Sequence, residues 1–345
     1  MNLYRSAIIG VTLLIFSIGC SKAQIQNISH TYVNPVLAMD FPDPAIIRTS
    51  NGIFYAYATQ GKNQAGYPVN IQLAKSSDLI HWEYIGEALP VTPEWGKNKK
   101  QYWAPTVSFD AGKNKYFMYY SVENNAGGKC IGVALSDKPE GPFTDVGEPM
   151  VCGEGFINID PMAFDDPQTG KKLLYWGSGF KAIKVQELDD SRTKFKEGST
   201  PLDVIAVNFD KDYDELVEGA WVIFHEGYYY IFYSGNNCCG LGTHYAVMVA
   251  RSKSAFGPFE HLSSYSKSGT SVILGMSNQW IGPGHNSTIT DDAGNDWILY
   301  HAVQPKNKAM TFREMLIDRI TWLNDWPMIE TGKPSYLPQP SPIIK

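Results

Sequence analysis

The chain has 345 residues and a mass of 38.5 kDa, with a net charge of −6 from 29 basic and 35 acidic side chains. Proteins that bind nucleic acid usually need a basic face, so this balance argues against a nucleic-acid partner. Aromatic residues reach 13%, charged residues only 19%, and 31 glycines and 21 prolines supply many turns. This composition excludes disorder, coiled coil and collagen, and it favours a turn-rich β protein.

The first nineteen residues have the pattern of an export signal. Arg5 precedes an apolar run over residues 7–17, which is too short to span a bilayer comfortably. The run ends in Ser17-Ile18-Gly19-Cys20, which resembles a bacterial lipobox, although serine stands where leucine is usual. We expect residues 1–19 to be a lipoprotein signal peptide, Cys20 to carry lipid and residues 20–33 to form a tether. Ordinary signal cleavage is the alternative.

This interpretation places the protein outside the cytoplasm. It would be lipid-anchored through Cys20 on the periplasmic or the outer face of a Gram-negative envelope, with no other membrane contact. Four cysteines remain after Cys20, an even number in a compartment that permits disulfides. Their spacing does not suggest zinc. Two of them, Cys238 and Cys239, are adjacent and could form a vicinal disulfide, or they could be two free or separately paired thiols; the others are Cys130 and Cys152.

A turn glycine followed by a β-rich aromatic run occurs five times along the chain. The spacings between these glycines are 60, 58, 57 and 67 residues, and the positions are Gly52, Gly112, Gly170, Gly227 and Gly294. A further strand ending in a polar turn follows four of the five, from Gln72, Val133, Val247 and Met315. The third copy departs from this pattern, with VQELDDSRTKF from Val185 in the corresponding stretch.

Each unit therefore predicts four strands in about 60 residues, which is one blade of a β-propeller. Five copies predict an all-β, five-bladed β-propeller that occupies residues 34–345 as a single domain. One blade cannot bury both of its faces alone, so most aromatic side chains are expected to pack between blades. Trp176, Trp221 and Trp297 lie on predicted strands and are expected to do so.

Nine residues before each turn glycine, the innermost strand of a blade is expected to begin. These positions hold Asp43, Trp103, Pro161, Glu218 and His285, and Asp160 directly precedes Pro161. Innermost strands all start at the same end of the central channel, so these side chains should surround one axial pocket. A single buried acid is more often a satisfied structural group, but ionised side chains at three matching positions indicate a site.

At these positions the sequence resembles the glycoside hydrolases of family 43. The matching motifs run in order across the chain: Asn34-Pro35-Val36-Leu37, Asp40-Phe41-Pro42-Asp43-Pro44, Trp103-Ala104-Pro105, Ile159-Asp160-Pro161, Val217-Glu218-Gly219-Ala220-Trp221, Gly282-Pro283-Gly284-His285-Asn286-Ser287 and Tyr300-His301-Ala302. The resemblance implies a five-bladed propeller that hydrolyses arabinose- and xylose-containing plant polysaccharides with inversion. Ala220 stands where the family more often has proline, which leaves the acid Glu218 in place.

The resemblance also implies the roles of the three acids. Asp43 matches the general base that activates water, Glu218 the general acid, and Asp160 the residue that raises the pKa of the acid and orients it. An inverting glycosidase holds its base and acid about 6.5–9.5 Å apart, so that a water molecule fits between them. The acid keeps its proton near neutral pH through burial and a nearby negative charge.

His285 is either a hydrogen-bonded core residue or, as the resemblance implies, the residue that faces a hydrated cation, often calcium, in the channel. Such a cation would support the site, and no cofactor is expected in the chemistry itself. Arg313 matches an arginine that contacts substrate hydroxyls, with a surface charge as the alternative. Trp103 and Phe41 are candidate sugar-stacking platforms. Core or supporting roles are expected for the two remaining candidates, His244 and His301.

We therefore expect an exported, monomeric, inverting enzyme that cleaves α-L-arabinofuranosyl linkages in arabinan or arabinoxylan of the plant cell wall. Xylosidases of the family often carry an additional C-terminal β-sandwich, whereas this chain ends soon after the fifth blade. The alternatives are a β-xylosidase or another furanosidase, such as a galactofuranosidase. A non-catalytic glycan-binding lipoprotein is a different class of alternative, against which the three intact acids argue. Endo and exo action are left open.

Overall fold

The computed structural model describes residues 30–63, 65–96, 101–306 and 312–345. The predicted signal peptide, Cys20 and most of the predicted tether lie outside the described residues. Within the described ranges, no helix is long and apolar enough to cross a membrane.

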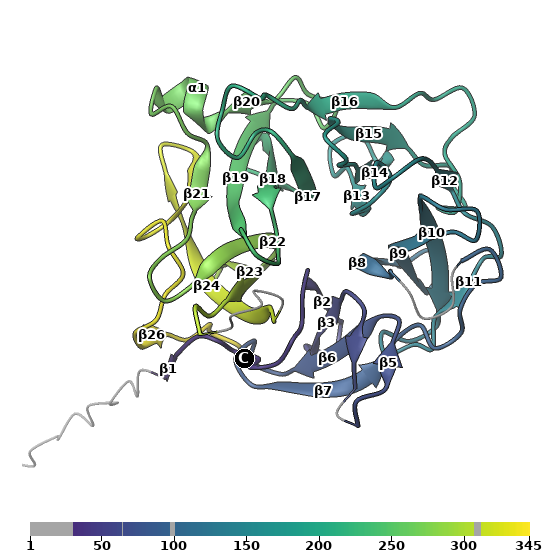
Figure 1. Ribbon diagram of the computed structural model, residues 1–345, viewed down its shortest axis with the longest axis horizontal. Helices are drawn as coiled ribbons and strands as arrows, with labels where there is room; N and C mark the ends of the chain where they lie inside the picture. Colours follow the sequence, from purple (N-terminus) through teal and green to yellow (C-terminus); the bar gives the residue numbers. More distant parts are fainter. Residues whose placement is uncertain (1–29, 64, 97–100, 307–311) are drawn as a thin grey trace, which may run out of the picture.

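Five antiparallel sheets surround a central channel as the blades of a propeller, which confirms the predicted all-β, five-bladed fold (Figure 1). The first blade contains β2 (Ala45–Arg48), β3 (Phe54–Ala58), β6 (Gln72–Ser76) and β7 (Trp82–Glu87). The second contains β8 (Trp103–Asp110), β9 (Lys115–Glu123), β10 (Lys129–Ser136), β11 (Thr144–Asp145) and β12 (Val151–Cys152). The third contains β13 (Met162–Asp165), β14 (Lys172–Trp176), β15 (Ile183–Glu187) and β16 (Leu202–Ile205).

The fourth blade contains β17 (Val217–His225), β18 (Tyr228–Asn237), β19 (His244–Ser252), β20 (Glu260–His261) and β21 (Val272–Leu274). The fifth contains β22 (Ile281–Thr290), β23 (Asp296–Val303), β24 (Glu314–Leu323) and β25 (Trp326–Ile329). The remaining elements are β1 (Thr31–Tyr32), β4 (Gly61–Lys62), β5 (Pro68–Val69), β26 (Gln339–Pro340) and the short helix α1 (Leu262–Ser266). Within each blade the first strand, β2, β8, β13, β17 or β22, lies nearest the channel (Figure 1).

The repeated turn glycines lie in the hairpins between the first and second strands of the blades. Four of them have a positive φ of 71° to 86°, a conformation that costs glycine nothing and other residues about 1 kcal/mol or more. In the second blade, Asn114 takes the left-handed position instead of Gly112. The repeat in the sequence therefore reflects one backbone requirement that each blade meets at its first hairpin.

The two ends of the described chain close the ring on the fifth blade. Strand β1 pairs with β26, and Tyr32, which is buried, donates its hydroxyl to the carbonyl of Ile317 at 2.9 Å. The Asn34 side chain donates to the carbonyl of Ile317 at 2.9 Å and accepts from its N–H at 3.0 Å, as a neighbouring strand would. The folded part thus begins by Thr31, so the predicted tether over residues 20–33 extends too far at its C-terminal end.

Replacing Asn34 with alanine should open this closure. The substitution leaves the buried N–H of Ile317 without its partner and its carbonyl with the Tyr32 hydroxyl alone, which costs about 1–3 kcal/mol of the free energy of unfolding. Urea unfolding measures the difference, with the exposed Asn278→Ala as the control. A loss at Asn34 of less than about 0.5 kcal/mol relative to that control would show that other contacts hold the ring closed.

Aromatic side chains fill the spaces between the blades, as predicted. Tyr175 of β14 packs in one cluster with Tyr229 and Tyr233 of β18, and its hydroxyl donates to the carbonyl of Ala255 at 2.5 Å. Trp176 and Trp297 are buried in such clusters, and Trp221 packs against two of them. Their large rings serve burial between blades rather than ligand contact.

Candidate active site

Each innermost strand has a residue in the left-handed conformation at or close to its start. These residues are Asp43, Ala104, Asp160, Gly219 and His285, with φ between 43° and 63°. In the second, fourth and fifth blades the pairing register shifts at the same place, as expected for β-bulges. A bulge re-aims the neighbouring side chains, and left-handed backbone at non-glycine residues tends to cluster at functional sites. Here it occurs beside the central channel.

A polar side chain at or just after the second strand of each blade holds the innermost strand of the next blade. Its hydroxyl or imidazole accepts the N–H of the left-handed residue in four of the five cases: Thr59 from Ala104 (2.8 Å), Ser121 from Asp160 (3.0 Å), Ser234 from His285 (2.8 Å) and His301 from Asp43 (3.1 Å). In the fifth case, Ser178 instead donates to the Glu218 carboxyl. Four of these residues are not predicted by the sequence motifs, which leave the role of His301 open. The signal was present, because each lies seven to nine residues after a turn glycine.

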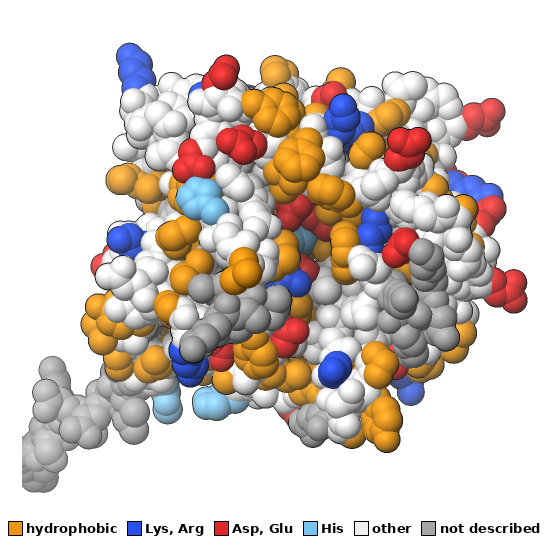
Figure 2. Space-filling view, viewed as in Figure 1, with side chains coloured by type: hydrophobic (Ala, Val, Ile, Leu, Met, Phe, Trp, Pro, Cys, Tyr) orange, Lys and Arg blue, Asp and Glu red, His pale blue; other side chains and the backbone are white. Residues whose placement is uncertain are grey.

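A cavity of about 540 Å³ opens at the channel end where the innermost strands begin. Acidic side chains and a histidine are visible deep in a hollow at the centre of the ring, surrounded by hydrophobic side chains (Figure 2). Six of the seven residues proposed from the sequence line this cavity: Asp43, Trp103, Asp160, Glu218, His285 and Arg313. Residues more than 200 positions apart in the chain thus meet in one place.

Asp43 is held as an ionised carboxylate. Its Oδ2 accepts the Thr59 hydroxyl at 2.5 Å, and its Oδ1 accepts Arg313 Nη1 at 3.0 Å. Nδ1 of His285 lies 3.5 Å from the same oxygen. Burial alone would raise the pKa of Asp43, but the Arg313 guanidinium and the two nearby imidazoles outweigh it and hold this pKa well below its usual range. An ionised carboxylate is the form that a general base requires.

Glu218 has the opposite electrostatic environment. Burial raises its pKa to about 7, although hydrogen bonds from the Tyr245 and Ser178 hydroxyls oppose this shift. Those hydroxyls donate to its two carboxyl oxygens at 2.8 Å and 2.9 Å, which fixes the orientation of the group. A positioned carboxyl that keeps its proton near neutral pH is suited to general acid catalysis.

Asp160 interacts electrostatically with both Asp43 and Glu218. Burial, followed by the charges of Glu218 and Asp43, raises the pKa of Asp160 well above its usual range. Its Oδ2 accepts the N–H of Gly219, the residue after Glu218, at 3.1 Å and lies 3.8 Å from His285 Nδ1. Asp160 therefore holds the backbone next to Glu218. The two carboxyls interact, so they titrate as a pair that retains a proton near neutral pH.

The pH dependence of kcat/KM should reflect these two environments. Glu218 must be protonated to act, so kcat/KM is expected to fall as the pH rises through about 7. Asp43 must be ionised, and its pKa is held low, so the acidic limb should lie below the range that is usual for an aspartate. Rates on linear arabinan, whose sugar leaving group needs the proton of the acid, measured from pH 3 to 9 test both limbs. A rate that keeps rising above pH 8 would contradict the assignment of Glu218 as the acid.

Phe41 does not lie in the pocket, so its prediction as a sugar-stacking platform is wrong. Its ring is fully buried in a cluster with Phe54 and Trp297, and its N–H donates to the carbonyl of Arg313 at 2.8 Å. Because the backbone at Asp43 is left-handed, the side chains of Phe41 and Asp43 point in different directions. A sequence motif does not reveal this difference.

Two other aromatic residues line the pocket beside Trp103. Phe156 and Phe180 form an edge-to-face pair with their centroids 6.0 Å apart, and Phe180 is half exposed. Neither follows the repeat, since both lie in loops that flank the third blade's first two strands. The only sequence signal was their proximity to Asp160 and Ser178. Their exposed ring surface offers apolar contact of the kind that the C–H face of a sugar accepts.

The four cysteines in the described part of the chain separate into two groups. Cys130 and Cys152 join β10 to β12 by a disulfide, whereas Cys238 and Cys239 are free thiols that line the pocket. The remaining open candidate, His244, lies outside the pocket, where its imidazole pairs with Asp212 at 2.8 Å.

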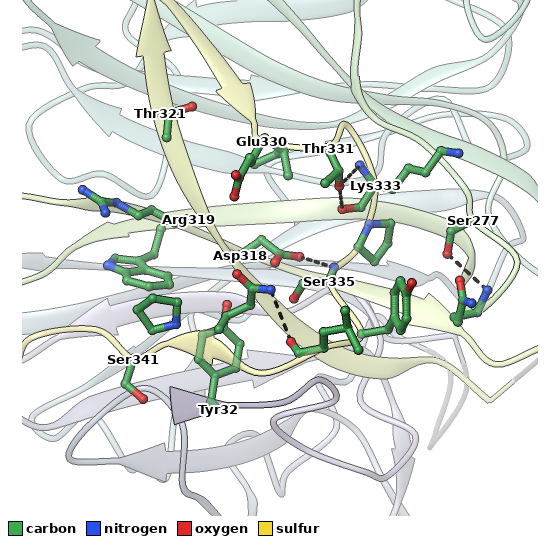
Figure 3. A pocket seen from close by; sticks show the side chains of 18 of the residues that line it. Tyr32, Ser277, Asp318, Arg319, Thr321, Glu330, Thr331, Lys333, Ser335 and Ser341 are labelled. Carbon is green, nitrogen blue, oxygen red and sulfur yellow. Dashed lines mark hydrogen bonds between the residues drawn. The ribbon is translucent and has the colours of Figure 1, made fainter. Parts of the chain in front are cut away.

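A larger cavity of about 930 Å³ lies between β24, β25 and the C-terminal segment, away from the channel (Figure 3). Its lining includes two acids among the described residues. Asp318 is engaged by the Tyr300 hydroxyl at 2.6 Å and the Ser335 N–H at 3.2 Å, and Glu330 is exposed. Only Asp318 of these two acids is buried, so the described lining lacks a pair of buried carboxyls, and the catalytic site is assigned to the channel pocket.

A buried carboxylate and a buried carboxyl facing one pocket are the groups by which enzymes hydrolyse glycosidic bonds. The fold and the site thus define a glycosidase built on a five-bladed propeller. The model of the glycosyl hydrolases family 43 matches residues 32–327, and the chain belongs to this family. The protein is therefore an enzyme that hydrolyses O-glycosyl bonds, with the inversion typical of its family, rather than a non-catalytic glycan-binding protein.

Relatives of known activity differ in substrate. A β-D-galactofuranosidase of Aspergillus niger is 30% identical, with 92% of each chain covered. An extracellular endo-α-(1→5)-L-arabinanase of Bacillus subtilis is 27% identical, over 83% of this chain and 86% of its own length. The crystal structure of a thermostable family-43 glycoside hydrolase superposes with a TM-score of 0.76 at 27% identity, covering 91% of this chain and all of the other.

Proposed function

We propose that this enzyme hydrolyses α-L-arabinofuranosyl linkages in arabinan or arabinoxylan. The observation that carries the proposal is the opposite electrostatic tuning of two carboxyls in one pocket, Asp43 ionised and Glu218 protonated. The names of several relatives, including the arabinanase of Bacillus subtilis, favour arabinose as the sugar. A neutral polysaccharide also suits a pocket in which Arg313 is engaged by Asp43.

The proposed mechanism is a single displacement. Asp43 accepts a proton from a water molecule as that water attacks the anomeric carbon, and Glu218 protonates the departing glycosidic oxygen. Thr59 and Arg313 keep Asp43 ionised and oriented, while Tyr245 and Ser178 orient Glu218. Asp160 positions the backbone beside Glu218, while burial and the negative charge of Asp43 favour retention of the Glu218 proton. Trp103, Phe156 and Phe180 supply apolar surface for the sugar.

A β-D-galactofuranosidase is the second candidate, because a relative of that name matches nearly the whole chain at 30% identity. Both sugars are five-membered rings, and the residues described above do not depend on the exocyclic group that distinguishes them. β-Xylosidase activity, an alternative from the sequence, would require the same pocket to accept a six-membered ring.

A substrate panel separates these candidates. Aryl α-L-arabinofuranoside, aryl β-D-galactofuranoside, aryl β-D-xyloside and linear arabinan are incubated with the enzyme, and the products are resolved by size and by anomer. We expect the arabinoside and arabinan to be cleaved with inversion, and product sizes to distinguish endo from exo action. Exclusive cleavage of the galactofuranoside would replace the first candidate by the second, and a retained anomer would contradict the mechanism.

We also propose that the chain is exported and carries lipid on Cys20. The support is the lipobox-like sequence and the extracellular location stated in the names of two relatives. The described chain starts at the outer edge of the ring, where an anchor would leave the central pocket unobstructed (Figure 1). Labelled palmitate should be incorporated into the wild type and not into Cys20→Ala. Equal labelling of the two would exclude the anchor.

A hydrated calcium ion in the channel is a further proposal, limited to structural support. Within the described ranges, no cluster of three His, Cys, Asp or Glu residues could hold a metal directly. Asn286 and His301, however, have buried side-chain polar atoms without a hydrogen-bond partner in the described part, and His285 lies beside Asn286. These groups and His285 fit a cation held through water molecules. Chelation should lower the melting temperature if calcium is bound, and no shift would exclude it.

A further inference from the structure

A buried lysine lies next to the pocket without lining it. Lys129, the first residue of β10, is only 4% exposed, and its Nζ lies 3.1 Å from the centroid of the Trp103 ring. The ammonium also donates to the backbone carbonyl and the side-chain oxygen of Gln101, at 2.8 Å and 3.2 Å. Lysine is almost never this buried unless it is paired, so the position indicates a specific role.

The backbone around Lys129 is fixed on both sides. Its N–H donates to the carbonyl of Gly155 at 2.9 Å, and its own carbonyl accepts the N–H of Gly153 at 3.1 Å. The next residue, Cys130, is joined to Cys152 by the disulfide between β10 and β12. The ammonium is therefore presented to the indole from a rigid support.

Trp103 lines the pocket, whereas Lys129 is not among the described residues that line it. The ammonium thus occupies ring surface away from the sugar. A cation over an indole face is attracted by the ring quadrupole, and the attraction is stronger when the pair is shielded from water. Trp103 begins β8 opposite Ser121, and the pairing register of the strand shifts after it, between Trp103 and Thr106.

We propose that Lys129 is a positioning residue for substrate binding, which fixes the plane of the Trp103 indole from behind and leaves its other face free for the sugar. Lys129 does not touch the substrate and orders the sugar contact through Trp103, while its charge also opposes the raised pKa of Asp160. The proposal rests on Trp103 as a sugar contact and adds the residue that orders it. Ordering the platform before binding lowers the entropic cost of forming the complex.

Lysine-to-methionine replacement at 129 tests this, since methionine keeps the length and removes the charge. Lys129→Met should raise KM about fivefold to tenfold with a smaller change in kcat, because it disorders the sugar platform and removes only a minor electrostatic contribution at Asp160. Lys129→Arg, which retains a cation that stacks on indole, should restore most of the affinity. Lys113→Met removes an exposed charge from the same blade and serves as the matched control.

A double-mutant cycle with Trp103→Leu separates positioning from a general structural effect. If Lys129 acts through Trp103, Lys129→Met adds nothing to KM once the indole is absent. Additive effects, an unchanged KM in Lys129→Met, or a loss in kcat that follows a lower melting temperature would each overturn the proposal. An unchanged KM in Trp103→Leu alone would instead remove the sugar contact on which it rests. The measurements use whichever panel substrate the wild type cleaves, so they do not depend on its identity.

Discussion

Asp43→Asn should reduce kcat by about 10⁴-fold while the affinity for substrate or product changes little. The amide has nearly the shape of the carboxylate and can still accept the Thr59 hydroxyl, but it cannot take a proton from water. Steady-state kinetics gives kcat, and calorimetric titration with a cleaved oligosaccharide gives the affinity. The melting temperature must be recorded as well, since the substitution leaves the Arg313 guanidinium with one charged partner fewer.

Asp40→Asn is the matched control for this prediction. Asp40 is three residues away and accepts the backbone N–H of Arg313 at 2.9 Å, but it is not among the described residues that line the pocket. Its substitution should change kcat by less than tenfold. If Asp43→Asn kept more than about a tenth of the wild-type rate, or if the two variants lost activity equally, Asp43 would not be the base.

Glu218→Gln should have an effect that depends on the leaving group. Cleavage between sugars needs a proton on the departing oxygen, so activity on arabinan should fall by about 10³- to 10⁴-fold. A nitrophenyl glycoside leaves as a stable anion and needs little protonation, so its loss should be much smaller. The fall in kcat/KM near pH 7 should also disappear, because the group that titrates there is gone. Rates on both substrates across the pH range measure all three effects.

Glu215→Gln provides the control for charge in the same pocket. Glu215 also lines the cavity but is exposed, so its substitution should leave both the leaving-group dependence and the pH profile close to wild type. Equal losses on arabinan and on the nitrophenyl glycoside for Glu218→Gln would mean that this residue does not protonate the leaving group.

The repeat of the blades along the chain could be predicted from the sequence because every blade has the same requirement for the backbone of its first hairpin. The hairpin of each blade needs a left-handed residue, and glycine meets this need at four of the five positions. A fixed offset from that hairpin then locates the start of the innermost strand, which is why Asp43, Asp160 and Glu218 could be placed together. The hairpin and the start of the innermost strand are only a few residues apart, so the chain between them strongly limits where that strand can begin.

Side-chain direction could not be predicted in the same way. Phe41 and Asp43 are two residues apart, yet Phe41 lies in the core and Asp43 in the pocket. The reason is that the backbone is left-handed at Asp43, just before β2 begins. Phe156 and Phe180 reach the pocket from loops that no repeat describes. Loop conformations and bulges depend on contacts with neighbouring blades, which a single sequence does not display.

The sequence by itself thus determined the number of blades and the acids that converge at the channel, since both follow from a short motif repeated along the chain. Only the tertiary structure decided how those acids are tuned. The low pKa of Asp43 requires Arg313, 270 residues away in the chain, and the closure at Asn34 requires Ile317. These contacts form when the fifth blade meets the first. The charge state of the site is therefore a property of the closed ring.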